Sequence, residues 1–247
     1  MCTVGLCHRV FEHAPLVVAA NRDEALDRPA TGPQWWHPEQ GAPFFAPRDE
    51  VAGGSWIGLN MHGVFVGITN RFMAPSSPQR TSRGLLVTHA LSASSADMAA
   101  DLVCTWNPQD VNAFHLLVAD AQSAYVLWHD GYRIQSDALN PGIHVITEQS
   151  FDAGDPTRER FVAGQLQGIV SQGTPDAQAL RELLATHHGR GFADVRVQLP
   201  EYNYGTRSSM LITSTHGSAQ ILSQDHGGFT PGALADVHTL ELRPLSL

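Results

Sequence analysis

The order of the strand-like and helix-like segments restricts the fold of this chain more than any other feature of its sequence. Short apolar runs bounded by turn residues fill the first part of the chain, and helical spacing begins at residue 83. Strand patterns then return, two further helical segments follow, and three apolar runs end the chain. Because strands and helices are grouped and do not alternate regularly, the sequence predicts an α+β fold with largely antiparallel sheets.

Individual segments can be assigned from their periodicity and their turn residues. Residues 3–10 and 15–23 flank the polar turn "FEHA" and predict an N-terminal hairpin, and residues 28–51, rich in Pro, Gly and aromatics, predict a long ordered loop. The predicted helices are residues 83–94, 95–106, 156–170 and 175–187. The other predicted strands are residues 55–60, 64–70, 113–120, 123–129, 142–148, 208–214, 219–224 and 237–242, of which the last three form a meander. No linker divides the chain, so we expect one domain over residues 1–247.

Composition excludes several classes of function. The 15 basic residues are all arginine, the acidic residues number 24, and the net charge of -9 comes without a basic run. A nucleic-acid backbone or an anionic membrane surface is therefore not an expected partner. The chain has no apolar stretch of spanning length, no secretory signal pattern, and an odd set of three cysteines without metal-type spacing. We expect a cytoplasmic protein with reduced thiols and without a metal or cofactor.

A cysteine directly follows the initiator methionine, at the start of the first predicted strand. Removal of Met1 would place a thiol and a free α-amine on the same residue, Cys2. The thiolate is a nucleophile, and an α-amine titrates at roughly pH 7.7–8.0, which suits a general base. The alternative is a small apolar residue that only packs.

The tetrapeptide "NRDE", Asn21 to Glu24, ends the second predicted strand beside the one that begins at Cys2. Arg22 could hold a thiolate or a carboxylate through its planar guanidinium, and Asp23 could orient the α-amine. The alternative is a solvated turn whose charges pair with each other.

Two later segments add candidates. Asn70 ends an apolar strand, where its amide could donate to an oxyanion, and Arg207 in "YGTRSS" could bind a substrate carboxylate. Trp35 and Trp36 could wall a pocket, although packing alone also explains tryptophans. The plain alternatives for Asn70 and Arg207 are turn residues.

Taken together, "MCT", "ANRDE", "RP" at Arg28–Pro29, "GGSWIGLN…G…ITN" and "YGTRSS" resemble the NRDE-motif family, also called the transport and Golgi organisation family. The matching motifs run from residue 1 to about residue 209 and therefore cover most of the chain. That family is similar to the N-terminal-nucleophile hydrolases, notably choloylglycine hydrolase and penicillin V acylase.

The resemblance implies a four-layer αββα sandwich and cleavage of a small non-peptide amide or related ester. It implies catalytic roles for Cys2, Arg22, Asp23, Asn70 and Arg207. We expect the substrate-contacting residues to be Asn21, Glu24, Trp35, Trp36, Glu148 and Ser208.

Two positions differ from those hydrolases. Their arginine and aspartate stand three positions apart, whereas Arg22 and Asp23 are adjacent and should face opposite sides of a strand. Glu148 stands where the hydrolases have asparagine, and an ionised carboxylate there would repel an oxyanion.

Two hypotheses of different classes follow. The first is a cysteine N-terminal-nucleophile hydrolase or acyltransferase that acts on a small amide or ester. The second is a non-catalytic carrier of haem or an acyl or lipid metabolite, which uses the same pocket. The sequence leaves the substrate and the oligomeric state open.

Overall fold

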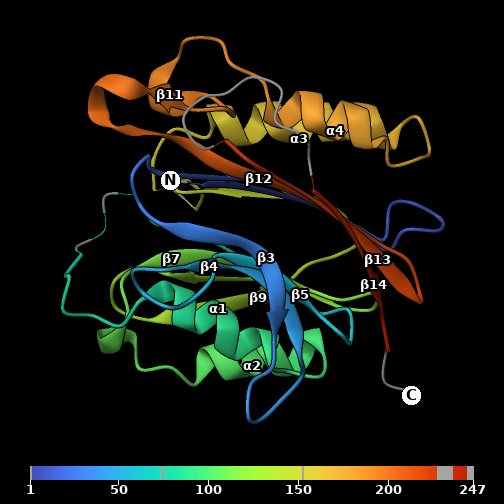
Figure 1. The fold of residues 1–247 in the computed structure, drawn as a ribbon, viewed down its shortest axis with the longest axis horizontal. Coiled ribbons are helices and arrows are strands. Elements are labelled where there is room, and N and C mark those ends of the chain that lie inside the picture. The colour runs from blue at the N-terminus through green and yellow to red at the C-terminus, as the bar shows by residue number, and fades with distance from the viewer. Residues whose placement is uncertain (1, 73, 75, 152, 227–235, 244–247) are drawn as a thin grey trace.

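The two sheets of the protein lie face to face between two pairs of helices (Figure 1). The computed structural model describes residues 2–72, 74, 76–151, 153–226 and 236–243. Helices α3 and α4 cover one sheet, and α1 and α2 cover the other. This arrangement is the predicted αββα sandwich.

The first sheet has the strand order β10-β1-β2-β12-β13-β14, with β11 paired to β12. Its strands are antiparallel and comprise β1 (Cys2–His8), β2 (Leu16–Ala25), β10 (Gly142–Thr147), β11 (Gln198–Leu199), β12 (Tyr204–Ser214), β13 (Ser218–Asp225) and β14 (Asp236–Glu241). The predicted N-terminal hairpin is confirmed as β1 and β2, and the predicted final meander as β12, β13 and β14. β1 lies between β10 and β2, so the strand that begins at Cys2 is paired on both sides.

The second sheet is a meander in chain order from β3 to β9. Its strands are β3 (Ala30–Trp36), β4 (Phe44–Asp49), β5 (Ile57–Asn60), β6 (Phe65–Asn70), β7 (Phe114–Ala119), β8 (Ala124–His129) and β9 (Ile134–Ala138). The prediction of a loop over residues 28–51 was wrong, because β3 and β4 occupy most of it. Pro33 lies on an edge strand beside a register shift between Thr31 and Gln34, where a missing N–H is tolerated. The irregular β3 hid the two-residue alternation in the sequence.

The described helices are α1 (Arg83–Leu91), α2 (Ala96–Cys104), α3 (Thr157–Val170) and α4 (Ala177–Leu184). Side-chain caps that the sequence displays begin α1, α2 and α4, whereas no side chain caps α3 after Pro156. The side chains of Ser82, Ser95 and Asp176 each accept a hydrogen bond from the first turn that follows them. The described part of the chain also contains three short 3₁₀ turns, at Pro108–Asp110, Gly191–Ala193 and Pro200–Tyr202. None of the described helices has the length and apolar character that crossing a membrane requires.

Three apolar layers hold the elements together. The central layer lies between the sheets and includes Val4, Leu6, Val18 and Ala20. The layer under α3 and α4 contains Val17 and Ala19 instead. A third layer joins the second sheet to α1 and α2. The alternation along β1 and β2 therefore decides which side chains face the space between the sheets and which face the helices.

Candidate active site

Cys2 begins β1 with its side chain on the inner face, among the residues between the two sheets. It lines a small hollow of about 250 Å³, hereafter the Cys2 hollow, together with Arg22, Trp56, Ser208 and Met210. These four residues also line a larger hollow of about 500 Å³, hereafter the cleft. The cleft lies between β3 and β4 of one sheet and β12, β13 and β14 of the other, so a molecule in it would lie next to the thiol.

Arg22 stands directly opposite Cys2 in the β1–β2 register and is only 5% exposed. Its guanidinium carbon lies 4.3 Å from the centre of the Trp56 ring, and Nη2 lies 3.0 Å from Oδ2 of Asp49. Arg28 donates two further hydrogen bonds to the same carboxylate, at 2.7 and 3.0 Å. The buried cation is therefore paired and fixed over an aromatic face at the wall of the Cys2 hollow.

Asn21 and Asp23 face the other side of the sheet, toward α3 and α4. The amide nitrogen of Asn21 donates to the carbonyl oxygens of Leu184 and Val195, at 2.9 and 2.8 Å. Its oxygen accepts from the Ser209 hydroxyl at 2.6 Å. Asn21 therefore connects β2 to the helical layer through hydrogen bonds. Arg22 and Asp23 are adjacent on the strand, and their side chains point to opposite faces of the sheet.

Asp23 is buried, with 1% exposure, and makes specific polar contacts. Its Oδ1 accepts a 2.6 Å hydrogen bond from Thr206, and its carbonyl oxygen accepts one from the Tyr204 hydroxyl at 2.8 Å. Burial raises the pKa of this carboxyl from 3.8 to about 6, against the lowering effects of Arg158 and the charged amino terminus. At neutral pH the group therefore bears its charge at an energetic cost.

The thiol of Cys2 is under opposing influences. Burial raises its pKa, and the Asp23 carboxylate acts in the same direction. The backbone N–H of Asp23, which hydrogen-bonds the thiol, and the Arg22 cation lower it. Arg83, the first residue of α1, adds a second cation in electrostatic reach: burial lowers the pKa of its guanidinium, and the thiolate of Cys2 raises it. The site therefore needs a nearby base to produce the thiolate at neutral pH.

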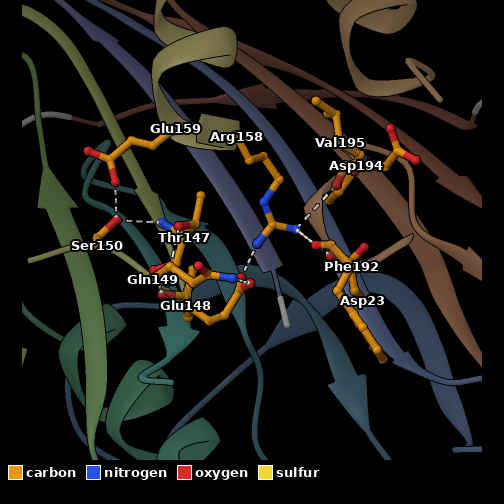
Figure 2. A network of polar contacts seen from close by, with 12 residues as sticks. Asp23, Thr147, Glu148, Gln149, Ser150, Arg158, Glu159, Phe192, Asp194 and Val195 are labelled. Carbon is orange, nitrogen blue, oxygen red and sulfur yellow. Dashed lines mark hydrogen bonds and ion pairs between the residues drawn. The ribbon is translucent and has the colours of Figure 1, made fainter. Parts of the chain in front are cut away.

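Glu148 follows β10 and is buried, with 1% exposure. Arg158 of α3, itself 5% exposed, hydrogen-bonds its Oε2 directly (Figure 2). The sequence suggested that an ionised carboxylate at this position would repel an oxyanion; in the structure the carboxylate is paired with a buried guanidinium.

The other predicted residues are divided between the cleft and the surface. Ser208 and Arg207 line the cleft, and Arg207 is the extra residue where the β12 register shifts between Thr206 and Ser208. Among the described residues, no hydrogen-bond partner reaches the buried Nε of Arg207. Glu24 is half-buried, and its Oε2 lies 3.8 Å from Nη2 of Arg22. Asn70 ends β6 and is exposed; Ile68, two residues earlier on the same face, lines the Cys2 hollow.

The predicted aromatic wall comes from a different tryptophan. Trp35 is 42% exposed and packs edge-on against Phe45, and Trp36 stacks on Phe44. Neither contributes to the Cys2 hollow or the cleft, whereas Trp56 lines both.

Sequence reasoning missed Trp56, Arg83 and Arg158. One signal was available for the two arginines, because both lie in the first turn of a helix, where the dipole disfavours a cation. An arginine in the first turn of a helix therefore indicates that a specific anionic group pairs with it or that the site needs its positive charge.

A family model described as transport and Golgi organisation 2 matches residues 1–223. The chain belongs to this family. The human transport and Golgi organization protein 2 homolog is 29% identical over 134 residues. These residues are 52% of this chain and 49% of the human protein, so the match spans about half of that protein. The bovine homolog is 27% identical over 228 residues, covering 80% of this chain and 81% of the relative.

Three solved structures with this fold are titled as an acid amidase, a bile acid hydrolase and an acylase. An N-acylethanolamine-hydrolyzing acid amidase ortholog from Caenorhabditis elegans aligns with a TM-score of 0.60 at 13% identity, over 86% of this chain and 92% of that one. A mutant conjugated bile acid hydrolase from Clostridium perfringens gives 0.58 at 11% identity, over 100% and 99%. Penicillin V acylase from Agrobacterium tumefaciens gives 0.53 at 14% identity, over 97% and 86%. The family member described here therefore has the N-terminal-nucleophile hydrolase fold, as the sequence resemblance implied.

Proposed function

We propose that this protein is a cysteine N-terminal-nucleophile enzyme that hydrolyses, or transfers, the acyl group of a small non-peptide amide or related ester. One observation carries the proposal: Cys2 starts a central strand and lines a hollow that continues into the cleft, with the cation of Arg22 directly opposite. The fold shared with amide hydrolases supports it.

In the proposed reaction, Met1 is removed and the α-amine of Cys2 accepts the proton of its own thiol. The thiolate attacks the carbonyl carbon, the C–N bond breaks, and the amine proton passes to the leaving nitrogen. Water, or an acceptor nucleophile, then attacks the thioester and releases the acyl group and the free thiol. Arg22 and Arg83 would stabilise negative charge at the sulfur, and Asp23 would orient the amine.

The remaining residues take supporting roles in this proposal. Asn70 stays the proposed donor to the oxyanion, because Ile68, two residues before it in β6, lines the Cys2 hollow. Arg207 and Ser208 would contact substrate in the cleft. A cytoplasmic location and one domain over residues 1–247 stay predictions from the sequence.

Carriage of haem or of an acyl or lipid ligand is the second candidate. The observation in its favour is that burial raises the pKa of the Cys2 thiol, which reduces its reactivity. A carrier would release its ligand chemically unchanged, and Cys2→Ala would still bind it.

Limiting iodoacetamide, followed by intact mass and peptide mapping, tests the proposal before the substrate is known. We expect a chain without Met1 that is labelled at Cys2 ahead of the buried Cys7 and the exposed Cys104. In a panel of amides and esters, Cys2→Ala should lower turnover about 10³-fold or more without loss of fold, and Cys104→Ala should leave it unchanged. A retained Met1, or full turnover by Cys2→Ala, would overturn the proposal.

A further inference from the structure

Helix α3 brings one buried arginine against two buried carboxylates on the helix side of the first sheet. Figure 2 shows Arg158 reaching from α3 to a position between Glu148 and Asp23. One guanidinium nitrogen donates to Glu148, and another lies 3.5 Å from Oδ2 of Asp23. All three side chains are at most 5% exposed, so these charges interact with little screening by water.

The local position of Arg158 is unfavourable without these partners. It is the second residue of α3, where the helix dipole disfavours a cation, and its burial removes hydration. The carbonyl oxygens of Phe192 and Asp194 accept further hydrogen bonds from the guanidinium, at 3.4 and 3.3 Å. The direct hydrogen bond to Glu148 and these two carbonyl oxygens offset that cost, and Asp23 adds a second carboxylate nearby.

Both carboxylates flank the start of the strand that carries the nucleophile. Strand β1 lies between β10 and β2, and Thr3 pairs with Thr147 on one side and Asn21 on the other. Glu148 follows Thr147 directly, and the backbone N–H of Asp23 hydrogen-bonds the thiol of Cys2. The charge on each carboxylate therefore acts at the amino-terminal end of β1.

We propose that Arg158 is a positioning residue for the Cys2 site: it keeps Asp23 ionised beside the amino terminus and cancels the charge of Glu148. The inference rests on the proposed function, in which Asp23 orients the α-amine. In this role Arg158 offsets the charge of Glu148, which stands where the resemblance implied an asparagine. Arg158 does not line the Cys2 hollow or the cleft and acts only through the two carboxylates.

The groups around Asp23 agree with this role. Arg158 of α3 favours its charged form, as does the amino terminus with Met1 in place, and Thr206 of β12 donates to it. Glu148, after β10, disfavours that form, and Cys2 of β1 and Tyr204 of β12 are further ionisable neighbours. Burial raises the pKa of Asp23 to about 6 despite Arg158, so the loss of the arginine would protonate Asp23 at neutral pH.

Carboxyl titration of Asp23 by NMR tests the inference without a substrate. The full chain is labelled with ¹³C-aspartate, and Asp23→Asn assigns the signal. Arg158→Gln should raise the midpoint of Asp23 by about one to three pH units. Glu148→Gln, which removes the like charge, should lower it, and Arg158→Lys should stay nearest to the parent chain. The inflection in the pH dependence of Cys2 alkylation by iodoacetamide should move with the Asp23 midpoint. The exposed Cys104 is the control, and its alkylation rate should depend on pH in the same way in every variant.

The outcomes separate this inference from the proposed function. An unmoved Asp23 midpoint in folded Arg158→Gln would overturn the positioning role, whatever the enzyme hydrolyses. If Arg158→Gln does not fold, Glu148→Gln decides, and an unchanged midpoint there would also overturn it. Shifted midpoints in a protein that hydrolyses no amide or ester would support the role of Arg158 while removing the catalytic proposal.

Discussion

Replacing Asp23 with asparagine should stabilise the protein at neutral pH. In the folded chain the pKa of Asp23 is raised from 3.8 to about 6 by burial, so the folded state binds a proton more tightly than the unfolded state. Stability contributed by this group is therefore present below pH 3.8 and is lost as pH rises to about 6. The difference of about two pH units corresponds to about 3 kcal/mol at pH 7. Asparagine retains an oxygen that can accept from Thr206, and Arg158 retains Glu148 as its partner.

Urea denaturation of both proteins from pH 4 to pH 8 measures this effect. The free energy of unfolding should be similar for the two near pH 4 and about 3 kcal/mol higher for Asp23→Asn at pH 7, and the difference should grow mainly below pH 6. Groups remote from Asp23 titrate equally in both proteins and cancel in the difference. A variant that is less stable at pH 7, by an amount that does not depend on pH, would refute the reasoning.

Asp49 provides a matched control with the opposite sign. Burial acts to raise its pKa, but the hydrogen bonds from Arg28 and from backbone N–H groups lower it below 3.8. Its stabilising contribution is present above pH 3.8 and is lost as pH falls through the lower folded value, so Asp49→Asn should destabilise at pH 7. If Asp23→Asn also loses turnover while it gains stability, the charge at Asp23 is kept for function.

Two further substitutions test the cleft and the packing. Arg22→Met removes a cation that lowers the pKa of the Cys2 thiol, so alkylation of Cys2 at neutral pH should slow. The control is Arg48→Met, which removes an exposed guanidinium over Trp36 and should leave the alkylation rate unchanged. Equal rates in both variants would contradict the role of Arg22. Gly58→Ala places a Cβ 2.6 Å from Leu91 and should cost about 1–3 kcal/mol of unfolding free energy in urea. Gly168→Ala, in α3 with open space around it, should instead gain about 0.5–1 kcal/mol, and a loss of equal size at both sites would argue against the packing explanation.

Much of the architecture follows from local patterns in the sequence. The hairpin that pairs Cys2 with Arg22, the caps of the helices and the final meander come from alternation, helical spacing and turn residues, which act over a few positions. The edge strand β3 escaped prediction because its proline and the register shift break the alternation. For the same local reason, strand alternation correctly predicted that Arg22 and Asp23 would face opposite ways.

The sequence by itself therefore determined the fold class, the family and the position of the thiol at the head of a central strand. Only the tertiary structure decided what surrounds that thiol. Trp56, just before β5, and Arg83 of α1 approach the site from the second sheet, and Arg158 approaches from α3 on the other side of the first sheet. No local periodicity encodes these positions. Burial then sets the charges, because the cost of ionising Asp23 and the pairing of Glu148 depend on how much water the assembled layers exclude.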